Sequence, residues 1–82
     1  MREIEWTGTA IEDMAALDNV VARRVRQAVE RFLQTGAGSV NRLHGIDPPE
    51  YRLRIGDWRV RFHRDGKTMR ILRVRHRLEA YR

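Results

Sequence analysis

The sequence predicts an α+β domain in which a four-stranded antiparallel sheet carries an N-terminal helix hairpin on one face. Three observations lead to this prediction. The chain has 82 residues, enough for a single domain over 1–82. Apolar residues recur at helical spacing before residue 36 and at every second position after residue 50. The elements therefore follow one another in the order β-α-α-β-β-β.

A short strand and a first helix are expected at the N-terminus. Residues 2–7 alternate between apolar and charged side chains, which is typical of a half-buried strand. Thr9 followed by Glu12 fits a capping box, and it predicts a helix over 10–17. The side chains expected to face the core from this helix are Ile11, Met14 and Ala15.

A second helix is expected to begin after Asp18 or Asn19, because either side chain can cap it. Its apolar stripe has the spacing of one helix face and consists of Val21, Val25, Ala28, Val29 and Phe32. Gly36 and Gly38 end the helix, and the short link before it predicts an antiparallel hairpin with the first helix. The Gly-rich and Pro-rich segment 36–50 is expected to be an irregular connection.

From Tyr51 onward the period changes to two, and three strands are expected. Residues 56–57 form a Gly-first turn between the first two strands, and residues 65–66 give the Asp-Gly signal of a second hairpin. The third strand covers 68–75. Its alternation breaks at residues 71–72, which indicates either a strand buried on both faces or a β-bulge.

The composition excludes several classes of protein. The chain has no cysteine, which excludes a disulfide scaffold, a thiol nucleophile and a Cys-ligated metal site. An apolar content of 41% argues against general disorder. No apolar run approaches the roughly 20 residues that span a bilayer, and no apolar signal region follows the N-terminal charges. A cytoplasmic protein without a membrane partner is therefore expected.

The positive charge is concentrated in the last third of the chain. The formal net charge is +6, and of 17 basic residues only Lys67 is a lysine. Residues 1–50 hold 6 basic and 8 acidic residues, whereas residues 51–82 hold 11 basic and 3 acidic residues. This asymmetry favours a polyanionic partner, with nucleic acid first and an anionic membrane or an acidic protein segment after it.

Four arginines are expected on one face of the sheet. Arg52 and Arg54 alternate with apolar residues on one strand, and Arg59 and Arg61 do so on the next. A tight turn places the two pairs side by side, where like charges oppose folding unless an anion binds. Arginine also binds phosphate with a planar fork and stacks on bases. A phosphate-binding face is the direct interpretation, and a solvated outer face is the alternative.

A second basic cluster lies at the C-terminal end and consists of Arg73, Arg75, His76, Arg77, Tyr81 and Arg82. Within it, His76 and Tyr81 can take part in proton transfer, which arginine does poorly. His44 and His63 are expected to be structural or surface residues. No acidic pair has metal-ligand spacing and no Gly-rich phosphate loop is present, so neither a metal nor a nucleotide cofactor is expected.

These segments resemble the RelE/ParE superfamily of bacterial toxin–antitoxin toxins. The resemblance depends on residues 43–45 (Leu-His-Gly), 51–62 (Tyr-Arg-Leu-Arg-Ile-Gly-Asp-Trp-Arg-Val-Arg-Phe), 74–77 (Val-Arg-His-Arg) and Tyr81. The Gly-Asp-x-Arg and His-Arg…Tyr elements are fairly specific together, and the order and length of the elements agree across the whole chain.

The resemblance implies a metal-independent endoribonuclease that enters the ribosomal A site and cuts the mRNA displayed there. In such enzymes the ribose 2′-OH attacks the adjacent phosphate. The catalytic positions implied by the resemblance are Arg52, Arg54, Arg59, His76, Arg77 and Tyr81. RNA-binding roles are expected for Arg61, Arg73 and Arg75. Because the best-known members carry lysines at the first two positions, we expect His76 or Tyr81 to move protons here while the arginines stabilise charge.

Two other functions remain open at this point. A ParE-type toxin shares the fold and inhibits DNA gyrase without cutting RNA. A non-catalytic RNA-binding module is a weaker alternative. In either toxin case the resemblance implies a cognate antitoxin, with an acidic or amphipathic segment that wraps the chain.

Overall fold

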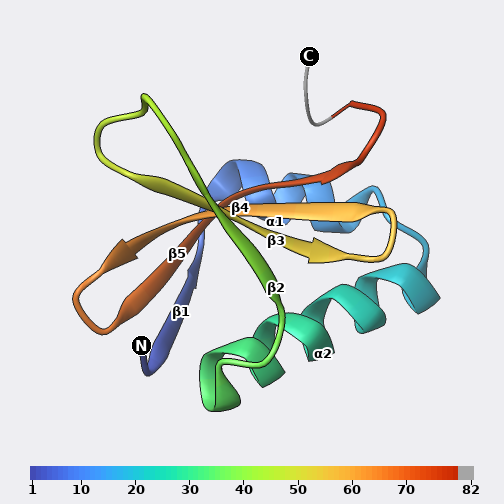
Figure 1. The fold of residues 1–82 in the computed structure, drawn as a ribbon. Coiled ribbons are helices and arrows are strands. Elements are labelled where there is room, and N and C mark those ends of the chain that lie inside the picture. Colours follow the sequence, from blue (N-terminus) through green and yellow to red (C-terminus); the bar gives the residue numbers. More distant parts are fainter. Residues whose placement is uncertain (80–82) are drawn as a thin grey trace.

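The computed structural model describes residues 1–79 and contains five strands and two helices (Figure 1). In chain order they are β1 (Glu3–Trp6), α1 (Gly8–Ala15), α2 (Asn19–Thr35), β2 (Ser39–Leu43), β3 (Glu50–Ile55), β4 (Trp58–Asp65) and β5 (Thr68–His76). No helix within the described residues is both long and apolar enough to cross a membrane.

The sheet is mixed and five-stranded, with the strand order β1-β5-β4-β3-β2. β1 pairs with β5 in parallel, and every other neighbouring pair is antiparallel. The α+β class is confirmed, but the expected four-stranded, wholly antiparallel sheet is wrong. A period of two fixes which side chains share a face, and it is the same for either strand direction, so it cannot reveal the parallel pair.

The extra strand is β2, which lies in the segment expected to be irregular. Val40 pairs with Leu53 of β3, and Asn41 pairs with Arg52. The glycines of this segment stand at the two ends of β2 and do not interrupt it: Gly36 caps α2 at φ 73°, and Gly45 follows the strand at φ 76°. Pairing with β3 satisfies backbone groups that would otherwise remain at the sheet edge.

One face of the sheet is covered by α2 and forms the core. Val25 and Val29 of the helix are fully buried in one cluster with Val60 and Phe62 of β4 and with residues of β3 and β5. The predicted apolar stripe of α2 is therefore confirmed. Its N-cap is Asp18, whose carboxylate accepts the backbone N–H of Val21 at 3.0 Å.

The shorter helix, α1, stands beside the outer edge of β5, where β1 has ended. Its N-cap is Thr7, not the expected Thr9, and the Thr7 hydroxyl also donates to the backbone oxygen of Ile71 at 2.8 Å. Because α1 covers a strand edge, only Ala10 of the helix is fully buried. Ile11 is 57% exposed, so the prediction that it faces the core is wrong. Ala15 is exposed as well, whereas Met14 is half-buried.

The break in the alternation of β5 is a β-bulge. Phe62 of β4 pairs with Ile71, and the preceding residue, Arg61, pairs with Arg73, so that Leu72 is the additional residue. The bulge shifts the phase of the strand by one position. As a result Val74 points into the core, and the arginines on either side of it point to the open face of the sheet.

Candidate nucleic-acid interface

Three rows of side chains cross the open face of the sheet, which is the face away from α2. The turn-proximal row, nearest the β3–β4 turn, consists of Arg54, Arg59 and Arg75. The middle row consists of Arg52, Arg61 and Arg73. The distal row consists of Glu50, His63 and Arg70 and continues to Glu5 of β1. Neighbouring strands lie about 4.8 Å apart and successive rows about 7 Å apart, so the six guanidinium groups of the turn-proximal and middle rows share a small area.

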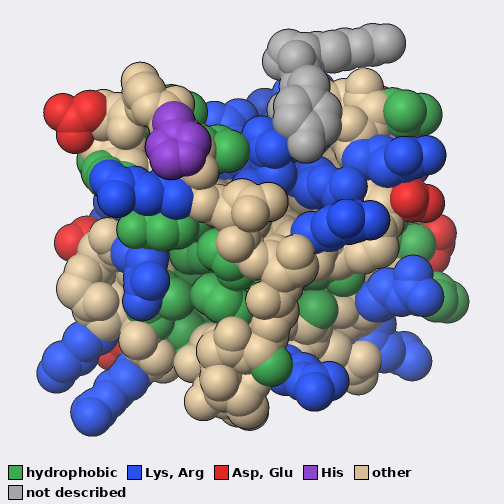
Figure 2. Space-filling model, in the orientation of Figure 1, with side chains coloured by type: hydrophobic (Ala, Val, Ile, Leu, Met, Phe, Trp, Pro, Cys, Tyr) green, Lys and Arg blue, Asp and Glu red, His purple; other side chains and the backbone are tan. Residues whose placement is uncertain are grey.

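The cross-strand pairing of four arginines predicted from sequence is confirmed, and β5 adds two more. Arg52 stands opposite Arg61, and Arg54 opposite Arg59. Figure 2 shows a group of Lys and Arg side chains over the end of the sheet that carries the β3–β4 turn and the carboxyl end of β5, and further Lys and Arg side chains elsewhere on this view.

The turn-proximal row is hardly neutralised. Within residues 1–79, no carboxylate forms an ion pair with Arg54 or Arg59. The Nη1 group of Arg59 donates instead to the backbone oxygens of Gly56 at 2.8 Å and Trp58 at 3.0 Å, which fixes the guanidinium beside the turn. Arg75 has a long contact of 3.9 Å with Glu79. This end of the face therefore carries positive charge that an anion can neutralise.

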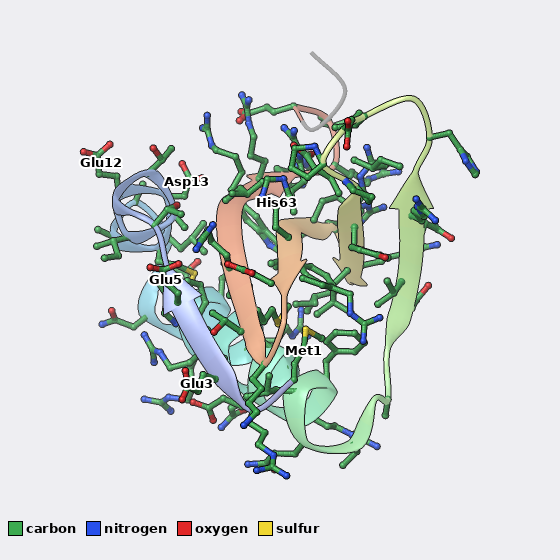
Figure 3. The ribbon with its side chains drawn as sticks, turned by 90° about the vertical axis from the view of Figure 1, so that its left-hand side faces the viewer. Met1, Glu3, Glu5, Glu12, Asp13 and His63 are labelled. Carbon is green, nitrogen blue, oxygen red and sulfur yellow. The ribbon has the colours of Figure 1, made fainter. Side chains whose placement is uncertain are left out.

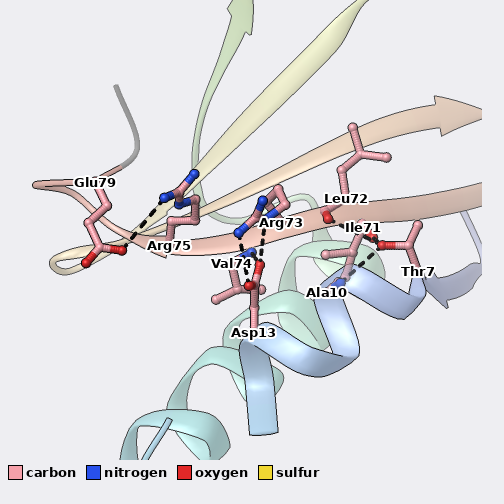
Figure 4. Close-up of polar contacts among 9 residues, drawn as sticks. All are labelled: Thr7, Ala10, Asp13, Ile71, Leu72, Arg73, Val74, Arg75 and Glu79. Carbon is pink, nitrogen blue, oxygen red and sulfur yellow. Dashed lines mark hydrogen bonds and ion pairs between the residues drawn. The ribbon is translucent and has the colours of Figure 1, made fainter. Parts of the chain in front are cut away.

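In the middle row, carboxylates hold two arginines in place. Glu50, the one buried charged side chain in the described chain, accepts hydrogen bonds on Oε2 from Nε of Arg61 at 3.1 Å and from Nη2 at 2.6 Å. Asp13 of α1 accepts from Nε of Arg73 at 2.9 Å and from the backbone N–H of Val74 at 2.9 Å (Figure 4). These charge-assisted bonds fix the two arginines and reduce the positive charge that they present to a ligand.

The distal row is compensated within the protein. Nε2 of His63 lies 3.6 Å from Oε1 of Glu50. Arg70 is bound to Glu5 at 2.5 Å and to Asp65 at 3.2 Å. The hydrogen bond and charge of Glu5 raise the pKa of Arg70 above its usual value. Along the strands, from the distal row to the turn-proximal row, carboxylates thus neutralise less and less of the positive charge.

His76 and Arg77 lie at the turn-proximal end. His76 pairs with Trp58 across the strands, and the two rings meet edge to face with centroids 5.3 Å apart. The register therefore places His76 on the helix side of the sheet, opposite the face of Arg75. Arg77 is attached to the β3–β4 turn, because its backbone N–H donates to the carbonyl of Asp57 at 2.7 Å and its Nε lies 3.3 Å from the Asp57 carboxylate.

A cavity of about 300 Å³ at the edge of β5 brings His76 and two arginines together. It is lined on the strand side by Trp58, Arg73, Arg75 and His76. Residues of α1 close the other side. Figure 3 shows Asp13 of α1 turned toward the sheet. His76 and Arg75 can therefore contact one ligand from opposite faces of their strand.

Tyr81 and Arg82 lie outside the described residues. Among the described residues no group of three or more His, Asp or Glu is arranged to hold a metal ion. Two residues of the interface, Glu50 and Asp13, were not predicted from the sequence. Glu50 has the same parity as Arg52 and Arg54, so extending the strand by one residue would have found it. Asp13 gave no such signal, because its role depends on α1 lying beside β5.

Comparison with known proteins identifies the family. A family model for the ParE toxin of the parDE type II toxin–antitoxin system matches residues 4–81. The chain belongs to this toxin family. No curated protein sequence matches it. The predicted superfamily is thereby confirmed, and the chain is a toxin of a toxin–antitoxin system.

Solved structures share the fold of this ParE-family toxin. In the RelB–RelE complex of Pyrococcus horikoshii, the matched chain has 22% identity and a TM-score of 0.77, with 98% of this chain and 100% of that chain covered. In the RelB–RelE complex of Methanococcus jannaschii, the matched chain has 20% identity and a TM-score of 0.76, with 94% of each chain covered. The YoeB dimer of Staphylococcus aureus has 19% identity and a TM-score of 0.72, with 93% of this chain and 98% of that chain covered.

Proposed function

We propose that this toxin is a ribosome-dependent endoribonuclease that cuts mRNA in the A site. The turn-proximal row carries the proposal, because Arg54 and Arg59 form no ion pair with a carboxylate of the described chain. Unneutralised guanidinium groups fixed on a rigid sheet suit the phosphate of a strand bound across them.

In the proposed reaction, the 2′ oxygen of one nucleotide attacks the adjacent phosphorus. The bond from phosphorus to the 5′ oxygen breaks, which leaves a cyclic phosphate and a 5′-OH. Negative charge develops on the non-bridging oxygens during the attack. Arg54, Arg59 and Arg75 stabilise this charge, and Arg77 lies at the same end of the sheet.

Two proton transfers complete the reaction, and we assign them to His76 and Tyr81. Nδ1 of His76 accepts the backbone N–H of Leu78 at 3.2 Å, which leaves Nε2 as the ring nitrogen available to a ligand. The imidazolium form of His76, in which Nδ1 no longer accepts that bond, donates the Nε2 proton to the leaving 5′ oxygen and becomes neutral. The phenolate form of Tyr81 takes up the 2′ proton.

The middle row has a different role in this scheme. Glu50 and Asp13 already hold Arg61 and Arg73, and these two arginines, together with Arg52, bind flanking phosphates and position the strand. Glu50 and Asp13 are thus positioning residues, because they act through the arginines that they hold.

The test is cleavage of mRNA in a translating extract. The wild-type chain should give breaks at A-site codons, and Arg59→Ala and His76→Ala should each reduce the cleavage rate. Arg70→Ala in the compensated distal row is the matched control and should cleave at the wild-type rate. Intact mRNA with the wild-type chain, or full activity of both Arg59→Ala and His76→Ala, would overturn the proposal.

Inhibition of DNA gyrase is the second candidate, and the match to the ParE toxin model favours it. In that case mRNA stays intact in the extract, and supercoiling by gyrase stops when the purified chain is added. The two assays give opposite results for the two candidates, so one preparation of protein decides between them.

A cognate antitoxin is the proposed partner in the cell. Three of the structural neighbours are toxin–antitoxin complexes, which supports such a partner for this chain. We further propose the cytoplasm as the site of action, because ribosomes and gyrase are both there.

A further inference from the structure

A cavity of about 270 Å³ lies at the edge of β3, between this strand and α2. Arg31 of α2 and Arg54 of β3 both line it, so it connects the helix with the turn-proximal row. The strand edge is open here, because β2 begins at Ser39, which pairs with Arg54. The other residues that line the cavity are uncharged and mostly small: Ala28, Ala37, Gly38, Leu53 and Ile55.

Arg24 brings a further guanidinium group to the same edge. It precedes Arg31 by seven residues, which is almost two helix turns, so both side chains lie on the same flank of α2. Nη1 of Arg24 lies beside the β3–β4 turn, 3.9 Å from the position that a Cβ atom on Gly56 would occupy. Figure 1 shows the first turns of α2 next to this turn. The positive surface therefore continues from the sheet face around the edge of β3 onto α2.

The charge of Arg24 and Arg31 is not neutralised within residues 1–79. Both side chains are exposed, and neither forms an ion pair with a carboxylate of that part of the chain. Asp57, the acidic residue of the β3–β4 turn, already lies 3.3 Å from Nε of Arg77. Like charges gathered in this way lower the stability of the free protein, and an anion that binds among them recovers the loss.

We propose that Arg31 and Arg24 bind phosphates of the RNA strand where it leaves the turn-proximal row and bends around the edge of β3 toward α2. The inference rests on the proposed function, because it extends the path of the same substrate strand. The guanidinium fork binds phosphate oxygens whatever the base, so these contacts position the strand without reading its sequence. The toxin is then held by phosphates that take no part in the reaction.

The occupant is a single strand because the path is curved. The turn-proximal row lies on the open face of the sheet, whereas Arg31 and Arg24 lie on a helix that covers the other face. A nucleic-acid double helix is stiff over far more than ten base pairs and does not follow such a bend. A single strand with unstacked bases follows it, and its phosphates can pass from Arg54 to Arg31 across the cavity that both residues line.

The length dependence of RNA binding tests this path. A labelled trinucleotide is short enough to lie on the row alone, whereas a labelled decanucleotide also reaches α2. Fluorescence anisotropy without ribosomes, at several salt concentrations, measures the affinity for each. Arg31→Ala and Arg24→Ala should each lower the slope of log affinity against log salt concentration by about 0.7 for the decanucleotide and leave the trinucleotide unchanged.

Arg26→Ala is the matched control. This arginine is exposed on the same helix and likewise forms no ion pair with a carboxylate of the described residues, but it lies on the flank of α2 that faces α1. The substitution removes the same charge, and it should leave the slopes for both RNAs unchanged. Thermal unfolding checks that every variant is folded.

The outcomes distinguish this inference from the proposed function. A wild-type slope for the decanucleotide in both Arg31→Ala and Arg24→Ala would overturn the inference. If Arg54→Ala weakens binding of both RNAs in that case, the phosphate site of the proposed function stands alone. If Arg31→Ala weakens binding of an RNA duplex but not of the decanucleotide, α2 binds a separate RNA helix, and the proposed path is wrong. If Arg54→Ala weakens neither RNA, the proposed function fails together with the inference.

Discussion

Both ends of the open sheet face carry arginines, but carboxylates of the described residues neutralise the arginine at one end and leave two arginines at the other end without ion pairs. In the distal row, Arg70 is bound to Glu5 and Asp65. In the turn-proximal row, Arg54 and Arg59 have no carboxylate partner within residues 1–79. About four residues of strand separate the distal row from the turn-proximal row. A count of arginines therefore does not locate a phosphate site, whereas the distribution of their partners does.

Arginines that stand side by side on a sheet can have two different roles. An arginine bound by a carboxylate contributes to the fold and can orient a ligand. An arginine without such a partner repels its neighbours and lowers the stability of the free protein, and this loss is recovered when an anion binds. In the middle row, Glu50 and Asp13 hold Arg61 and Arg73, so these two arginines contribute to the fold and can also orient a ligand.

The largest expected effect is on activity at the turn-proximal row. Arg59→Ala should lower the rate of mRNA cleavage about 100-fold or more, since one fixed donor to a developing oxyanion is removed. The measurement is the cleavage rate in a translating extract at saturating protein. Arg70→Ala provides the comparison at the other end, and an equal loss in both variants would show that the two rows do not differ in function.

A smaller effect, on stability, is expected from the compensated part of the face. Glu50→Ala should lower the free energy of unfolding by about 2 kcal/mol, because the hydrogen bonds of Arg61 to a buried carboxylate are lost. Urea unfolding followed by circular dichroism measures the change. Glu30→Ala on the exposed face of α2 is the control and should change little.

Arg54→Ala in the same unfolding experiment tests the turn-proximal end of the face. Removing an arginine that stands opposite Arg59 relieves repulsion, so this variant should be as stable as the wild type or slightly more stable. A loss of stability as large as that of Glu50→Ala would mean that Arg54 has a structural role, and the electrostatic distinction between the rows would be wrong.

Much of the fold could be predicted because it depends on periodicity. The stripe of α2 and the β3–β4 turn follow from the sequence pattern. The break in alternation at residues 71–72 indicated the bulge only as one of two alternatives, and the structure decides for it. The parallel pairing of β1 and the existence of β2 could not, because neither the direction of a strand nor its pairing is encoded in a period of two. Glycines also flank β2 closely, so the composition of segment 36–50 resembles that of a loop.

The candidate site divides in the same way. The facing pairs of Arg52 with Arg61 and Arg54 with Arg59 follow from alternation and a tight turn, and the structure has both pairs. How far carboxylates neutralise each row could not be predicted from the sequence, because Asp13 and Glu5 reach β5 from elements that precede it by some sixty residues. His76 was grouped with the arginines by its neighbours in sequence, yet alternation places it on the other face of β5.

The smallest expected effect is on the salt dependence of RNA binding, and it separates the rows without requiring catalysis. Each phosphate neutralised on a single strand contributes about 0.7 to the slope of log affinity against log salt concentration. Arg54→Ala should therefore reduce the slope for a short single-stranded RNA by about 0.7. Arg70→Ala should leave the slope unchanged, because Glu5 and Asp65 already neutralise that guanidinium and no counterion is released from it. Fluorescence anisotropy at several salt concentrations measures both slopes. Equal reductions in the two variants would mean that RNA lies along the whole face, and the contrast between its two ends would then concern stability alone.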